Sequence, residues 1–154
     1  MGHRCLVLTA ALFVLAPGRA ATAPQDEALD GLRVEALLTV GAKYHYGGQS
    51  PETGFDCSGL VAHVYERAWG LELPRSVREQ ALVGKPVRRL RDLEPGDLVF
   101  YNTRNSPFSH VGIYVGDGRF VHAPRPGKRV RADRVNNPYW RARFSGARRL
   151  TPPE

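Results

Sequence analysis

Residues 54–70 read GFDCSGLVAHVYERAWG, and this stretch has the pattern of an amphipathic helix that begins with a cysteine. Apolar side chains recur along it at helical spacing, at Leu60, Val61, Val64 and Ala68. Asp56 is a residue type that caps helix N-termini and Gly70 is a type that ends helices, so we predict a helix over residues 57–69. This places Cys57 in the first turn of a helix that buries one face.

Cys57 is either a small core residue or a reactive thiol. The sequence encodes two cysteines, and the other one, Cys5, lies in a predicted signal peptide. A single cysteine in an exported chain cannot form an intramolecular disulfide, which leaves a free thiol. The unpaired amides and the dipole at a helix start favour an anion, so we predict a lowered pKa for the Cys57 thiol.

Residues 1–23 are predicted to be a secretory signal peptide. Arg4 precedes an apolar run over residues 5–16, and small residues follow. That run is shorter than the roughly 20 apolar residues that span a bilayer, so we expect no stable membrane anchor. We expect a flexible lead over residues 24–30 and a single domain over residues 31–152. The product would be an exported monomer, either periplasmic or secreted.

The chain is basic, with a formal net charge of +7. Much of the excess lies in residues 125–134 and 141–149. Such charge suits an anionic partner, such as nucleic acid, anionic lipid or an acidic polymer, but it also suits a solvated surface. Neither zinc-finger spacing nor an aromatic-rich single-strand-binding pattern occurs, so we expect no nucleic-acid partner.

Helical patterns come first in the sequence, and strand patterns follow. We predict helices over residues 27–41, over residues 57–69 and from Ser76, where SVRE forms a capping box. Short strands are predicted within or near residues 94–101, 110–115, 119–123, 128–132 and 143–150. This order predicts an α+β fold in which N-terminal helices pack on a central, mainly antiparallel sheet.

A predicted hairpin carries His110 and His122, and its loop decides whether the two histidines meet. A two-residue loop puts them on opposite faces of the ribbon. A three-residue loop over residues 116–118 pairs Gly112 with His122 and puts both histidines on one face. Gly118 suits the left-handed residue that ends such loops, so we predict the three-residue loop and a histidine pair on one face.

A thiolate faced by two imidazoles suits acyl transfer. Cys57 would attack an amide carbonyl, His110 would hold the thiolate as an ion pair and protonate the leaving amine, and His122 would orient His110. The backbone amide of Cys57 would supply one oxyanion donor. The same residues together with His45 would suit a zinc hydrolase. However, no C-x-x-C or H-E-x-x-H spacing occurs, so we expect neither a metal nor another cofactor.

Several segments follow one another in a recognisable order: YHYGG (44–48), GFDCSGLV (54–61), LPRS (73–76), EPGDLVFY (94–101), SHVGIYVGDGRFVHAP (109–124) and FSGARRL (144–150). Together they resemble the NlpC-type family of cell-wall peptidases, which are papain-like cysteine hydrolases of bacterial peptidoglycan. The resemblance implies a papain-like fold. It also implies that Cys57 is the nucleophile, His110 the base and His122 the third polar residue.

Three further site residues are implied by the resemblance. Tyr44 corresponds to a family tyrosine that lies beside the nucleophile and helps form the oxyanion site. Asp56 and Ser58 correspond to residues that hold the free amine of a peptidoglycan stem peptide, although Asp56 also suits a purely capping role.

By resemblance, the protein is a cysteine endopeptidase that remodels the cell wall by cutting stem peptides, typically between D-glutamate and a diamino acid. Two alternatives stay open: an amidase or acyltransferase on the same papain-like frame, and a non-enzymatic wall-binding protein. The second usually has a broken catalytic set, whereas Cys57, His110 and His122 are all present here.

Overall fold

The computed structural model describes residues 23–153. The predicted signal peptide lies outside the described residues except for its last position. The described helices are α1 (Pro24–Leu38), α2 (Cys57–Trp69), α3 (Val77–Gln80), the 3₁₀ helix η1 (Leu90–Asp92) and α4 (Pro138–Arg143). The strands are β1 (Gln49–Ser50), β2 (Gly54–Phe55), β3 (Lys85–Val87), β4 (Leu98–Tyr101), β5 (His110–Gly116), β6 (Arg119–His122), β7 (Arg131–Arg134) and β8 (Phe144–Arg149). None of the helices in this part of the chain is long and apolar enough to cross a membrane.

Helix α2 has the bounds that its sequence predicts. The Asp56 carboxylate accepts a hydrogen bond of 2.7 Å from the amide of Gly59, which caps the N-terminus. At the other end Gly70 adopts the left-handed conformation with φ of 61°, which ends the helix. In the apolar stripe, Leu60, Val61 and Val64 are fully buried and Ala68 is partly buried.

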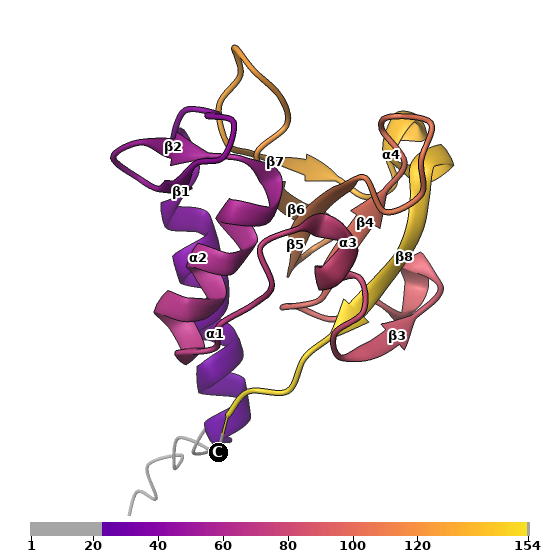
Figure 1. The fold of residues 1–154 in the computed structure, drawn as a ribbon. Helices are drawn as coiled ribbons and strands as arrows, with labels where there is room; N and C mark the ends of the chain where they lie inside the picture. The colour runs from indigo at the N-terminus through magenta and orange to yellow at the C-terminus, as the bar shows by residue number, and fades with distance from the viewer. Residues whose placement is uncertain (1–22, 154) are drawn as a thin grey trace, which may run out of the picture.

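Helix α1 lies beside α2, and the two form a layer on one face of the larger sheet (Figure 1). The flexible lead expected over residues 24–30 is wrong, because these residues form the first turns of α1. Pro24 suits the first helical position, and Asp26 and Glu27 complement the positive end of the helix dipole. Leu29 packs against the core, which ties this turn to the domain.

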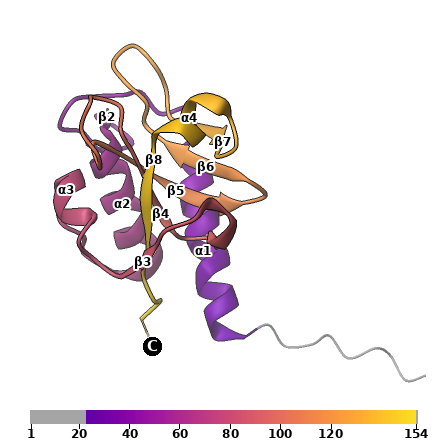
Figure 2. The same cartoon turned by 90° about the vertical axis from the view of Figure 1, so that its right-hand side faces the viewer.

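The larger sheet has the strand order β3-β8-β4-β5-β6-β7, and all its pairs are antiparallel. This confirms the α+β fold with N-terminal helices on an antiparallel sheet. Figure 2 shows β8 crossing the front of the molecule, with α4 next to its upper end.

Strand β4 shows why the sheet is buried on both faces. Leu98 and Phe100 belong to the core under α1 and α2, whereas Val99 and Tyr101 point to a second apolar cluster on the opposite face. Trp140 of α4 belongs to that second cluster, so α4 covers the face that the N-terminal helices leave open.

The β5–β6 hairpin has the predicted register but not the predicted loop. Tyr114 pairs with Phe120, as expected. The loop is a two-residue turn of Asp117 and Gly118, with φ of 53° and 70°, and not a three-residue loop. A bulge between Tyr114 and Gly116 supplies the extra residue, and it keeps the face on which each side chain lies.

The sequence does not predict β1, β2, β3, η1 or α4, and β7 lies later in the chain than the strand predicted near residues 128–132. β1 and β2 have two residues each, and β3 has three, including Pro86. Strands this short cannot display the alternation of apolar and polar residues that predicts a strand from sequence. The bound of β7 depends on its pairing with β6 across the loop over residues 123–130, which no local pattern marks.

Candidate active site

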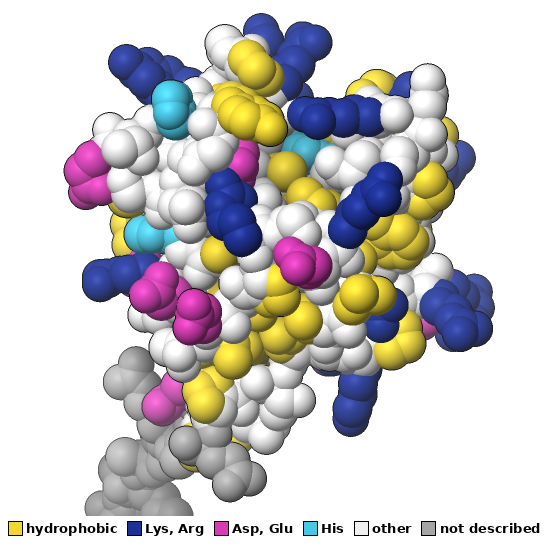
Figure 3. Space-filling model, in the orientation of Figure 1, with side chains coloured by type: hydrophobic (Ala, Val, Ile, Leu, Met, Phe, Trp, Pro, Cys, Tyr) yellow, Lys and Arg dark blue, Asp and Glu magenta, His cyan; other side chains and the backbone are white. Residues whose placement is uncertain are grey.

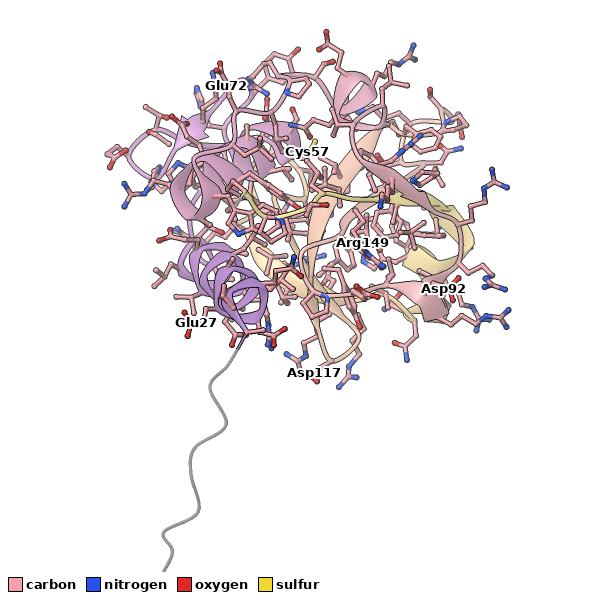
Figure 4. All side chains as sticks on the ribbon, turned by 90° about the horizontal axis from the view of Figure 1, so that it is seen from below. Glu27, Cys57, Glu72, Asp92, Asp117 and Arg149 are labelled. Carbon is pink, nitrogen blue, oxygen red and sulfur yellow. The ribbon has the colours of Figure 1, made fainter. Side chains whose placement is uncertain are left out.

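A groove of about 530 Å³ opens where α2 begins and β5 starts. Figure 4 shows Cys57 at this junction between the helices and the sheet. The lining includes Tyr44, Cys57, Thr103, Arg104, Ser109, His110, Arg125, Arg131, Asp133, Tyr139 and Trp140. The groove thus brings together residues from both halves of the chain.

Cys57 is a free thiol that is partly exposed in this groove. Burial raises the pKa of the Cys57 thiol, while the backbone amides of Val111 and Ser58 hydrogen-bond to the sulfur and oppose that rise. The prediction of a lowered pKa is therefore wrong. Removal of the sulfur from water outweighs the favourable field at the helix start.

The two histidines lie on one face of the hairpin and contact each other, as predicted. Nε2 of His110 and Nδ1 of His122 are 2.8 Å apart, and the two rings are nearly perpendicular at 83°. Both side chains are buried, with 4% and 0% of their surface exposed. This bond uses Nε2 of His110 and leaves Nδ1 as the nitrogen available to other groups.

The histidines do not point into the layer that carries α2. Side chains alternate along β5, so Val111 faces the helices and His110 faces the cluster around Trp140. The amide of Val111 nevertheless reaches the Cys57 sulfur. The thiol and the imidazole therefore both line the groove at the end of the sheet, where β5 begins, and His110 does not lie on the helix-covered face.

Both histidines are held neutral near pH 7. Burial lowers the pKa of His110 to about 3, and the neighbouring His122 and Arg104 add to this effect. Burial also lowers the pKa of His122, although its hydrogen bond to Asp133 opposes the change. The resting site is therefore a neutral thiol beside neutral imidazoles, and not the ion pair expected from the sequence.

Asp133 is a member of this cluster that the sequence analysis missed. Its Oδ2 lies 2.9 Å from Nε2 of His122, and it also accepts hydrogen bonds from Arg131 at 3.0 Å and from the Trp140 indole at 3.2 Å. Asp133 is the single acidic residue between positions 118 and 153, and this isolation among basic residues was an available signal. Trp140 belongs both to the second apolar cluster and to the groove wall.

Asp56 and Ser58 lie beside the groove but do not line it. The Asp56 carboxylate caps α2, accepts the amide of Gly47 at 3.1 Å, and forms two hydrogen bonds of 3.1 and 2.7 Å with the guanidinium of Arg75. Arg75 also donates to the Ser58 hydroxyl at 2.8 Å. Both carboxylate oxygens already have protein partners, which favours the capping role. The amine-binding role stays a prediction.

Tyr44 does line the groove. Its backbone forms a β-bridge with Phe55. Its amide also donates a hydrogen bond of 3.0 Å to the carbonyl of Lys128, in the loop before β7. Burial raises the pKa of the Tyr44 hydroxyl, and the nearby Cys57 adds to the rise. The structure thus places Tyr44 next to the thiol, with a hydroxyl that stays protonated and able to donate.

The groove is rich in positive charge. Arg104 and Arg125 line it, and no hydrogen bond or ion pair joins either guanidinium to another described residue. Figure 3 shows Lys and Arg side chains, in dark blue, around a hollow in which a histidine is visible. Such a groove suits a ligand that carries carboxylates.

The residues considered for a zinc site do not all converge. His45 is exposed on the loop before β1 and does not line the groove. Within residues 23–153, no group of three or more His, Cys, Asp or Glu side chains is arranged to hold a metal ion.

A family model described as the NlpC/P60 family matches residues 41–149. Gamma-DL-glutamyl hydrolase of Bacillus subtilis (strain 168) is 43% identical over 117 residues, which cover 75% of this chain and 28% of that protein. Murein DD-endopeptidase MepS/Murein LD-carboxypeptidase of Escherichia coli (strain K12) is 44% identical over 110 residues, which cover 71% of this chain and 56% of that protein. The matched region is therefore well under two thirds of either relative.

The NlpC/p60 domain of the peptidoglycan hydrolase SagA has a similar solved structure. The two chains are 30% identical with a TM-score of 0.68, and the match covers 79% of this chain and 98% of that domain.

Proposed function

The chain belongs to the NlpC/P60 family, and from this premise we propose that it is a cysteine endopeptidase that hydrolyses amide bonds in peptidoglycan stem peptides. One observation carries the proposal: the free thiol of Cys57 opens into the same groove as His110, which is hydrogen-bonded to His122. The printed names of the relatives, a glutamyl hydrolase and a murein endopeptidase, support the choice of substrate.

In the first half of the reaction, His110 acts as a general base. Nδ1 of His110 takes the proton of the Cys57 thiol while the sulfur attacks the amide carbon, and the carbonyl π electrons move to oxygen. The Tyr44 hydroxyl and the backbone amide of Cys57 donate to this oxyanion. The C–N bond then breaks, and the proton on His110 passes to the leaving nitrogen, which leaves a thioester.

In the second half, water replaces the amine. His110 takes a proton from water as its oxygen attacks the thioester carbon, and the C–S bond of the tetrahedral intermediate then breaks. The sulfur regains its proton from His110, which restores the neutral resting pair. Because the pKa of His110 is lowered to about 3, the ring releases this proton readily once the thiolate leaves.

We propose the bond between D-glutamate and a diamino acid as the target. The name of the Bacillus subtilis relative supports this bond. The free carboxylates of such a peptide also match Arg104 and Arg125, which line the groove without acidic partners among the described residues. A second candidate is a DD-bond, because the name of the Escherichia coli relative specifies it at similar identity.

The site of action follows from the substrate. A peptidoglycan endopeptidase acts in the cell wall, so we propose that the protein is exported to the periplasm or beyond. We also propose that it acts as a monomer, since Cys57, both histidines and Tyr44 come from one chain.

The test is digestion of purified muropeptides by wild type and by Cys57→Ala, with products identified by mass spectrometry. We expect wild type to release fragments that end at D-glutamate and Cys57→Ala to release none. Fragments produced by cleavage between two D-residues would instead identify the DD-bond as the target. No new fragment with wild type would contradict the proposal.

Two matched histidine variants distinguish a loss of activity that is specific to the site from a general effect of replacing a histidine. His63 packs on Phe55 away from the groove, so His63→Gln should keep its activity. His110→Gln should lose activity by about 100-fold or more, since it lacks the base. Inhibition by iodoacetamide but not by a chelator would set the thiol mechanism apart from a zinc mechanism.

A further inference from the structure

Asp133 ends a hydrogen-bonded chain that starts in the groove. The chain runs from His110 to His122 over 2.8 Å and from His122 to Asp133 over 2.9 Å. We propose that Asp133 is a positioning residue: it fixes the tautomers of both histidines and so makes Nδ1 of His110 the nitrogen that accepts the Cys57 proton. This inference rests on the proposed thiol chemistry.

The direction of the chain follows from what each group is able to do. An ionised carboxylate only accepts hydrogen bonds, so Nε2 of His122 must carry a proton and donate it to Asp133. A neutral His122 then has a lone pair on Nδ1, which must accept. Nε2 of His110 must therefore carry a proton and donate it, and the lone pair of a neutral His110 lies on Nδ1.

The surroundings of Asp133 keep it ionised. Its hydrogen bond from His122, followed by that from Arg131, lowers the pKa of the Asp133 carboxyl to about 2. The groups that face it come from four other elements as well as its own strand: His110 on β5, His122 on β6, Tyr101 on β4, Trp140 on α4 and Arg131 on β7. Of these only Arg131 is charged at neutral pH, and it favours the carboxylate.

The position of Asp133 suits this task more than a purely structural one. Asp133 is partly exposed at the groove wall, whereas the ring that it contacts is fully buried. The Trp140 indole donates to the same Oδ2 atom that His122 contacts and so holds that oxygen in place. The oxygen is thus held by a second donor, next to the histidine, that cannot accept a proton.

The substitution Asp133→Asn tests the direction directly. An amide is nearly the same size but is able to donate through its nitrogen, so His122 is no longer forced to carry its proton on Nε2. We expect kcat to fall about 100- to 10,000-fold with KM changed by less than about threefold, because the wrong tautomer removes the base and leaves binding intact. Asp117→Asn removes the same charge on the exposed β5–β6 turn, far from Cys57 in Figure 4, and should keep wild-type kcat.

Two-bond proton–nitrogen NMR correlations of ¹⁵N-labelled histidines give a second readout that needs no substrate. In the wild type at neutral pH we expect His110 and His122 both to be protonated at Nε2 only, and in Asp133→Asn we expect this pattern to be lost. A wild-type His110 protonated at Nδ1, or an Asp133→Asn enzyme that keeps its kcat, would overturn the proposal. If the variant does not fold, the wild-type tautomers alone decide. An error in the assigned substrate leaves this NMR result unaffected.

Discussion

At the scale of the residue, Cys57 combines two opposing effects. It lies at the start of α2, where the dipole favours an anion, but burial raises the pKa of its thiol. The adjacent histidine is also held neutral, with a pKa lowered to about 3. The proton thus stays on sulfur in the resting protein, and the proposed reaction requires it to move to His110 as the sulfur attacks a substrate carbonyl.

Alkylation of Cys57 measures this directly. We expect the rate with iodoacetamide to rise with pH to a midpoint above that of the same thiol in urea-unfolded protein, because the folded thiol has the higher pKa. Unfolded protein is the control, since it reports the thiol without its environment. A folded-state midpoint below neutral pH would show instead a resting thiolate.

At the scale of the element, the hairpin of β5 and β6 needs a glycine where the imidazole of His122 lies. A Cβ at Gly112 would lie 2.8 Å from both the Phe120 ring and the Val121 carbonyl oxygen, and 3.1 Å from Cβ of His122. These contacts are too close, so the strands would have to move apart beside the histidine pair.

Gly112→Ala is therefore expected to lower the free energy of unfolding by about 1–3 kcal/mol and to reduce kcat by displacing His122. Urea denaturation and muropeptide turnover measure the two effects. Gly31→Ala is the matched control, because a Cβ there meets nothing within 4 Å and Ala favours the helix α1. Equal stability of the two variants would contradict the close packing at Gly112.

The N-terminus of α2 depends on Asp56, and two substitutions separate its capping bond from its charge. Asp56→Asn keeps an oxygen for the Gly59 amide but loses the partly exposed ion pair with Arg75, so we expect a loss of about 1 kcal/mol. Asp56→Ala also loses the cap and should be less stable by about another 1 kcal/mol. Thermal unfolding followed by circular dichroism measures both. Equal losses would mean that the cap contributes nothing.

At the scale of the whole molecule, the buried histidine makes the fold sensitive to acid. His110 has a pKa of about 3 in the folded protein against an ordinary value of 6.5, so the unfolded chain binds the proton first. The contribution of neutral His110 to the free energy of unfolding is fully present above the ordinary pKa. It is lost as the pH falls toward the pKa of the folded state, by about 3–5 kcal/mol in all. Asp133 acts in the same direction below its ordinary value of 3.8.

We therefore expect the Tm to fall steadily between about pH 6.5 and pH 4, well before most carboxylates titrate. Calorimetry across this range measures the slope. His110→Gln removes one of the two buried titrating histidines and should reduce this slope, which separates His110 from the general repulsion of a basic chain. A wild-type Tm that does not change over this range would contradict the burial of a neutral histidine.

Much of the architecture could be predicted because it rests on local chemistry. Capping at Asp56 and Gly70 fixes α2 to the residue, and alternation along the hairpin puts His110 and His122 on one face. The hairpin also shows the limit. Its register was predictable from parity, whereas a bulge and a two-residue turn were not distinguishable from a three-residue loop with the same parity.

Local sequence patterns predict the fold class, the bounds of α2, and the thiol and two imidazoles of the candidate site. Long-range contacts place the site at the end of the sheet, bring Asp133 to His122, and bury the thiol so that it is neutral at rest. The reason is the distance along the chain over which each effect acts. Capping and periodicity act over a few residues, but burial and the pairing of β6 with β7 depend on segments that only the folded chain brings together.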